Sequence, residues 1–233
     1  MTLYRFLSLG VFLLIVFLTG VFPTAGQTQT ELELIVTWQA NTLFPSDYQG
    51  KAFPGPRSSI TASIEAYQGG KWTDLSRASL TWVLDGKVIG RGEGMQELLF
   101  RIPARPAPSL TLKAVVALPD TGTSFNAFSV IPVLGPQVVI AAPFPERRVA
   151  PQSRFTLEAL PYFWNAQSLG TIFFSWTANA TQQRLKGEHT ITLTVGAPTN
   201  EHERELQVNV LLQNPDEPTE FARDYAQLDI QSP

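Results

Sequence analysis

Alternation of apolar and polar residues is the clearest pattern along this chain. Between Ile60 and Tyr67 every second residue is apolar, and those between them are mostly polar. Because successive side chains of a β-strand point to opposite faces, this pattern predicts a strand with one buried face. Further strands are predicted at Leu80–Leu84, Lys87–Gly90, Met95–Ile102, Leu110–Leu118 and Ser124–Ile131. Asp85 and Gly86 predict a two-residue hairpin turn, since such turns need positive φ angles.

The second half of the chain repeats the first. Trp82 and Trp176 lie 94 residues apart, and Leu110 and Leu206 lie 96 apart. We interpret this near-constant offset as an internal duplication. The inward-facing positions expected in the second half are Phe155, Leu157, Ala159, Phe174, Trp176, Ile191, Leu193, Val195, Leu206, Val208, Val210 and Leu212.

The repeated pattern predicts the fold class. A tryptophan on the third strand, between two sheets, is typical of the immunoglobulin-like sandwich, and each half has one. We therefore expect an all-β chain of two tandem immunoglobulin-like β-sandwiches, preceded by an N-terminal hydrophobic signal or anchor helix. The expected boundaries are 1–26 for the signal or anchor, 31–132 for the first sandwich, 133–136 for a short Pro/Gly linker and 137–233 for the second sandwich.

Two long loops interrupt the alternation. Trp38–Ser59 is the largest irregular stretch, and Asn214–Arg223 is acidic and contains proline. A final strand is expected around Leu228 and Ile230. The linker is too short and too apolar for a flexible tether, so we expect it to restrict the angle between the sandwiches.

The N-terminal segment indicates export. Arg5 precedes an apolar run, Phe6–Phe22, which Pro23 ends, and this order is typical of a secretory signal with cleavage expected before Gln27. The alternative is that residues 6–22 remain as a membrane anchor. The expected location is periplasmic, cell-surface or extracellular. The chain contains no cysteine, which excludes disulfides and the lipid attachment of bacterial lipoproteins.

Charge argues against nucleic acid as a partner. The chain has 17 basic and 20 acidic residues, a formal net charge of −3. A balance of this kind gives no field strong enough to concentrate the chain on phosphate.

Three segments carry a resemblance to a known group. Leu34–Asn41, Trp82–Lys87 and Ala159–Phe163 resemble exported bacterial proteins with tandem immunoglobulin-like domains of the Ig and PKD kind. The resemblance implies a spacer, an adhesin or an assembly part of the cell envelope, and it brings no catalytic residues. Periplasmic pilus chaperones are similar in architecture only, because their basic cleft residues and their exposed alternating strand have no match here.

Metal and catalytic motifs are weak. His189 and His202 each lie beside acidic residues, and a zinc site could use both with a carboxylate, but solvated hairpin positions fit the alternation better. No Gly-x-Ser-x-Gly elbow is present. Gly90–Gly94 is followed by a predicted strand rather than a helix, which favours a turn or bulge over a phosphate loop.

The acidic loop is the other metal candidate. Asp216, Glu217 and Glu220 could bind calcium weakly, although a solvated acidic loop is the favoured interpretation. We therefore expect no cofactor, no metal and no enzymatic activity.

Aromatic residues outside the inward register are the candidate contact residues. Exposed Trp and Tyr side chains form sugar-stacking platforms and protein-binding anchors. The candidates for a ligand or partner contact are Trp38, Tyr48, Trp72, Tyr162 and Trp164. The alternative is that Tyr162 to Trp164 cover the open end of the second sandwich and that Trp38 pads a contact between the sandwiches.

Several functions remain open at this stage. The first is a non-enzymatic structural, adhesion or protein-interaction module that binds a protein or glycan of the envelope. The second is a carbohydrate-binding module, which would need two coplanar aromatic rings on one face. A chaperone-like two-domain assembly factor is a third. A hydrolase would need a pocket on loops such as Trp38–Ser59 where titratable groups converge. The partner and the oligomeric state are open.

Overall fold

The computed structural model describes residues 32–119, 122–144, 146–179, 181–186, 188–198 and 204–231, with the backbone alone for 181–186. The expected signal or anchor segment, 1–26, lies outside these residues, as does His202. Within the described residues, no helix is both long enough and apolar enough to cross a membrane.

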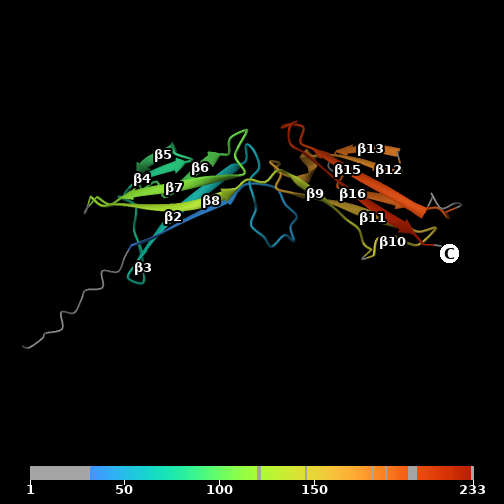
Figure 1. Ribbon diagram of the computed structural model, residues 1–233, viewed down its shortest axis with the longest axis horizontal. Helices are drawn as coiled ribbons and strands as arrows, with labels where there is room; N and C mark the ends of the chain where they lie inside the picture. The colour runs from blue at the N-terminus through green and yellow to red at the C-terminus, as the bar shows by residue number, and fades with distance from the viewer. Residues whose placement is uncertain are drawn as a thin grey trace, which may run out of the picture. The chain divides into compact units, whose positions relative to one another are not determined.

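The first half of the described chain forms two antiparallel sheets (Figure 1). One sheet has the order β1–β2–β3, with β6 also paired to β2, and the other has the order β5–β4–β7–β8. The strands are β1 (Glu33–Ala40), β2 (Ser59–Gln68), β3 (Lys71–Thr73), β4 (Ser79–Leu84), β5 (Lys87–Glu93), β6 (Glu97–Arg101), β7 (Ser109–Ala117) and β8 (Ser124–Pro132).

The second half repeats this arrangement. A three-stranded sheet has the order β14–β11–β9, and a five-stranded sheet has the order β10–β16–β15–β12–β13. The elements are β9 (Gln137–Ala141), β10 (Arg148–Val149), β11 (Arg154–Tyr162), the 3-10 turn η1 (Leu169–Thr171), β12 (Phe173–Ala178), β13 (Thr181–Lys186), β14 (Thr190–Thr194), β15 (Glu205–Gln213) and β16 (Phe221–Ile230).

Each half has its own hydrophobic core. Trp82 and Trp176 are fully buried at the centres of β4 and β12, each among inward residues of both sheets of its half. The two positions are equivalent, because Trp82 pairs with Ala114 of β7 as Trp176 pairs with Val210 of β15. The predicted all-β fold, with a tryptophan buried between the two sheets of each half, is therefore confirmed.

The predicted inward faces are also confirmed for most strands. Ile60, Ala62, Ile64 and Ala66 are at most 1% exposed. In the second half, Leu193 is only half-buried at the end of β14, whereas the other expected inward residues are buried. The hairpin turn after β4 has positive φ angles of 46° at Asp85 and 81° at Gly86, as expected.

The acidic loop differs from the prediction. It was expected to run from Asn214 to Arg223 and to be solvated, but β16 already begins at Phe221, and Glu220 is buried. The reason is a closed hairpin, because the backbone N–H of Asn214 donates to the carbonyl of Glu220 at 3.0 Å.

Candidate interaction surface

The structure places the five candidate aromatic residues in two different surroundings. Trp38 and Trp164 are 6% and 0% exposed, Tyr48 and Tyr162 are half-buried, and Trp72 is 63% exposed. The expectation of exposed rings is therefore wrong for Trp38 and Trp164. Their indoles are held inside the chain by carbonyl acceptors, since Trp38 Nε1 donates to Val130 at 3.1 Å and Trp164 Nε1 donates to Gln137 at 2.8 Å.

Four of the five belong to one contact region between the two cores. The long loop after β1 reaches the second core through an isolated β-bridge, in which the backbones of Leu43 and Trp164 exchange hydrogen bonds of 2.7 and 3.2 Å. Tyr48 packs edge-on against Tyr162 with ring centroids 5.6 Å apart. Trp38 contacts Phe53, with ring centroids 6.5 Å apart. We call this region, Trp38 and 41–58 with 162–165 and 214–220, the junction.

The junction also has a polar side centred on Asn165. Its side-chain oxygen accepts a 2.5 Å hydrogen bond from the Ser58 hydroxyl, and its amide nitrogen donates to the Pro56 carbonyl at 2.9 Å. Arg57 forms an ion pair with Glu217 beside it. These bonds tie the loop of the first half to the second half, which matches the alternative that the aromatic residues pad an internal contact.

Glu220 lies beneath Asn165. Its carboxylate accepts hydrogen bonds from the Asn165 backbone at 2.7 Å and from the Asn214 side chain at 2.6 Å. Burial raises the pKa of Glu220, and these two hydrogen bonds oppose the rise. The residue therefore has a structural role in the junction, and the described residues contain no cluster of three metal-ligating side chains around it or elsewhere.

A hydrolase would require a pocket on a loop such as Trp38–Ser59 where titratable groups converge. A cavity of about 620 Å³ there is lined by Asp47, Glu158 and His189, among others, and His189 Nε2 lies 3.5 Å from Glu158 Oε1. Titratable groups therefore do converge next to the long loop. Ser46 also lines this pocket, and no hydrogen bond joins it to His189 within the described residues.

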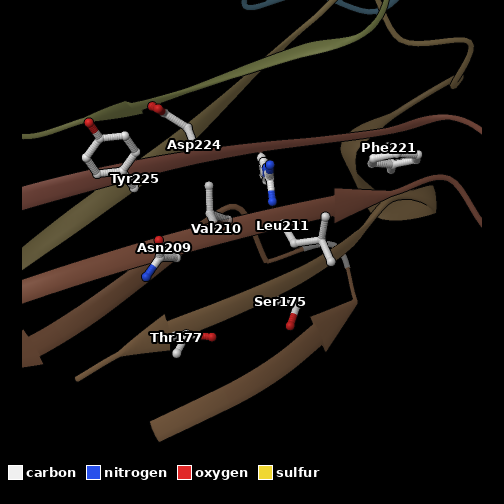
Figure 2. Close-up of a pocket in the computed structure, with 9 residues that line it drawn as sticks. Ser175, Thr177, Asn209, Val210, Leu211, Phe221, Asp224 and Tyr225 are labelled. Atoms are coloured by element: carbon white, nitrogen blue, oxygen red, sulfur yellow. The ribbon is translucent and has the colours of Figure 1, made fainter. Parts of the chain in front are cut away.

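A larger hollow than this pocket lies on the outward side of the five-stranded sheet (Figure 2). It has a volume of about 730 Å³ and extends over β12, β15 and β16. Figure 2 shows Phe221 and Tyr225 towards its two ends, with Leu211 between them and Asn209 beside Tyr225. We call the outward side of these three strands the open face. Its side chains are Phe173, Ser175, Thr177, Glu205, Gln207, Asn209, Leu211, Gln213, Phe221, Arg223, Tyr225, Gln227 and Asp229.

The open face exposes three large apolar side chains to solvent. Phe221, Tyr225 and Leu211 are 60%, 68% and 43% exposed. Sequence reasoning missed this surface because it treated the alternation only as a signal for the core. The same alternation gives the outward residues, since Phe221 and Tyr225 occupy positions opposite to buried Ala226 and Leu228.

Charge is separated along the open face. Arg223 lies near the end of the sheet where β16 begins, while Glu205 and Asp229, which are cross-strand partners, lie at the other end. All three are exposed, and none of their side chains has a hydrogen bond or an ion pair within the part of the chain that the structure describes. Their charges are therefore available to a partner.

The first half presents a different outer face at the equivalent place. Phe128 of β8 occupies the position of Tyr225, because Ala114 pairs with Ala127 as Val210 pairs with Asp224. Phe128 is 62% exposed, but the Lys113 ammonium lies 5.5 Å from its ring centroid. The hollow of the open face is specific to the second half among the cavities described.

Comparison with known proteins adds little to the fold described above. No family model matches the chain, and no curated protein matches it. The solved structures that match are tandem fibronectin-III and immunoglobulin-like domains. The fibronectin(III)-like modules of Clostridium thermocellum CbhA are 16% identical, with a TM-score of 0.31, covering 85% of this chain and 95% of that one.

Two further matches have similar values. The titin Ig tandem A164–A165 is 10% identical with a TM-score of 0.27, covering 87% of this chain and 100% of that one. A 1.5-MDa bacterial ice-binding adhesin is 13% identical with a TM-score of 0.30, covering 85% of this chain and 65% of that one. The class of the protein, a chain of tandem all-β domains, rests on its own sheets and cores.

Proposed function

We propose that this chain is a non-enzymatic interaction module of the cell envelope and that the open face is its contact surface. The observation that carries the proposal is the exposed set Phe221, Leu211 and Tyr225 around an unpaired Arg223, on a sheet face that no described part of the chain covers. Aromatic residues and arginine are the side chains most enriched at the centres of protein interfaces.

The proposed location outside the cytoplasm rests on the N-terminal segment. Arg5 and the apolar run 6–22 support export, with residues 1–26 either cleaved or kept as an anchor. We propose sandwiches at 31–132 and 137–233 with the linker 133–136 between them. The first buried core ends at Ile131 and the second begins at Val138, which supports these boundaries.

A protein partner fits the open face better than a glycan. Sugar-binding platforms use coplanar aromatic rings, whereas Figure 2 shows the rings of Phe221 and Tyr225 turned differently, with the aliphatic Leu211 between them. A glycan remains the second candidate because polar Asn209 and Thr177 lie beside Tyr225. Loss of glycan binding in Tyr225→Ala, measured by calorimetry with wall and capsule glycans, would favour this second candidate.

Site-specific photocrosslinking tests the proposed contact surface. Tyr225 is replaced by p-benzoylphenylalanine in the full chain, expressed in its own envelope, and Phe128 is replaced in a matched control. We expect a discrete crosslinked product from position 225 and little or none from position 128, since only the former belongs to the open face. Equal products from both positions, or none from 225, would contradict the proposal.

A further inference from the structure

The basic and acidic residues of the open face lie at its opposite ends, so two copies of the face can pair with opposite charges in contact. Its side chains form rows across the strands, two residues apart along each strand. The relevant rows are Arg223 with Leu211 and Ser175, then Tyr225 with Asn209 and Thr177, then Gln227 with Gln207, and finally Asp229 with Glu205. The row with Arg223 and the row with Asp229 and Glu205 thus lie at opposite ends of the face. The two rows between them contain uncharged side chains.

The acidic end keeps two carboxylates that no ion pair neutralises within the described residues. Arg148 of β10 is in register with Asp229, but its guanidinium is bonded to Glu146 at 3.0 Å. Asp229 and its cross-strand partner Glu205 have no ion pair in the part of the chain that the structure describes.

A two-fold rotation makes these ends meet. If a second copy faces the first with its strands reversed, and the axis passes between the rows of Tyr225 and Gln227, Arg223 of each copy lies opposite Asp229 and Glu205 of the other. Tyr225 then lies opposite Gln227. A two-fold interface uses the same patch on both subunits, which is the symmetry that this pattern needs.

We propose that the open face is a homodimer interface, in which two copies of this chain pair face to face with antiparallel strands. This inference rests on the proposed function and names the partner as a second copy of the chain. The first half does not offer this complementarity, because Lys113 is the charged residue described on the outward side of β4, β7 and β8.

The area of the face indicates a weak dimer. Three strands spaced about 4.8 Å apart and four rows about 6.7 Å apart give roughly 400 Å² per copy, or about 800 Å² in total. Interfaces below about 1,200 Å² are mostly weak or transient. We therefore expect a dimer that forms where the chain is concentrated, as it would be in an envelope layer.

The absence of cysteine makes a direct test possible. A single Gln227→Cys chain, treated in its native envelope with a short bismaleimide, is expected to give a covalent dimer of twice the chain mass on a denaturing gel. The chain has no other cysteine to react. Phe128→Cys is the matched control, and we expect it to give at most a trace of the dimer.

Charge reversal tests the pairing itself. In the Gln227→Cys background, Arg223→Glu alone and Asp229→Arg alone are each expected to reduce the dimer several-fold. Coexpression of these two variants, carrying tags of different size, is expected to restore a mixed dimer, because positions 223 and 229 then carry opposite charges at both of their contacts. Restoration also shows that both variants are folded.

The outcomes separate this inference from the proposed function. Absence of a dimer from Gln227→Cys, or a dimer that neither reversal weakens, overturns the homodimer. If position 225 still crosslinks to another protein, and only Arg223→Glu removes that product, the open face binds an acidic partner instead and the proposed function stands. If position 225 gives no crosslink at all, both fail.

Discussion

Two tryptophans occupy equivalent core positions but differ in their hydrogen bonding. Trp82 Nε1 donates to the Met95 carbonyl at 2.9 Å. Trp176 Nε1 is buried and has no partner in the part of the chain that the structure describes. A buried donor without an acceptor destabilises the fold, so the second core tolerates a polar defect that the first core avoids.

Replacement of each indole by phenylalanine should reveal this difference. Trp82→Phe leaves the Met95 carbonyl without its donor, whereas Trp176→Phe removes an unpaired N–H. We expect Trp82→Phe to lower the free energy of unfolding by about 1–2 kcal/mol more than Trp176→Phe does. Denaturant unfolding followed by circular dichroism measures both.

Truncation to alanine is the control for burial. Trp82→Ala and Trp176→Ala should each cost about 3–5 kcal/mol, because both side chains are fully buried. Equal losses for the two phenylalanine variants would show that the hydrogen bond to Met95 contributes nothing.

At the scale of elements, glycines set where strands turn. Gly94, between β5 and β6, has a φ angle of 64°, and a Cβ there would lie 2.5 Å from the Ser76 carbonyl oxygen. Gly86, in the hairpin after β4, has a φ angle of 81° and nothing within 4 Å of such a Cβ. Both positions favour glycine for their backbone, but only Gly94 is also enclosed.

Alanine substitutions separate these two effects. Gly86→Ala should cost about 1 kcal/mol through backbone strain alone. Gly94→Ala should cost more, about 2–4 kcal/mol, because the rigid Ser76 backbone must also move. Thermal unfolding of the two variants compares them directly, and a smaller loss for Gly94→Ala would contradict the described turn.

The strands were predictable from the sequence because alternation and turn residues agree locally. Asp85 and Gly86 have the positive φ angles that the hairpin needs, and the inward set from Ile60 to Ala66 is buried as expected. The two-residue strand β10 was not predictable, since Arg148 and Val149 pair in parallel with Asp229 and Ile230, far away in the sequence.

The candidate site was harder to predict than the fold. Trp38 lies in the inward register of β1 with Val36 and Ala40, so the alternation of this strand was a signal for its burial that the prediction did not use. Trp164 lies outside the named strands, and nothing local indicates that Gln137 supplies the carbonyl acceptor for its indole. Burial of such a loop residue depends on contacts between distant segments. The open face, in contrast, follows from the alternation of β16 once both of its faces are considered.

At the scale of the whole molecule, the described chain 32–231 belongs to one compact unit that holds two cores. The junction connects these cores through Asn165, whose neighbours include the buried carboxylate of Glu220. Because burial changes the pKa of this carboxyl group on folding, the stability of the chain depends on pH.

The direction of this dependence follows from the raised pKa of Glu220. The folded chain binds a proton at higher pH than the unfolded chain, whose carboxyl has the ordinary pKa of 4.5. This group therefore favours the folded state increasingly as pH falls from neutral towards 4.5. Glu220→Gln should remove this contribution, measured as the slope of the unfolding free energy against pH.

A surface carboxylate provides the comparison. Glu97→Gln, which changes an exposed side chain on β6, is the comparison variant. If Glu220→Gln and Glu97→Gln give the same slope, the buried carboxylate does not titrate differently in the folded chain.

The Leu43–Trp164 bridge bears on how this chain could be rearranged in evolution or by engineering. Leu43 packs against the second core although it precedes most strands of the first. If the second sandwich were cut from the first at the linker, it would lose the Leu43 side chain and the two backbone hydrogen bonds between Leu43 and Trp164. The loop that carries Trp164 depends on these contacts. The two repeats are therefore not independent units that can be exchanged freely. A second sandwich that is moved into another protein and folds there would have to carry residues from both repeats.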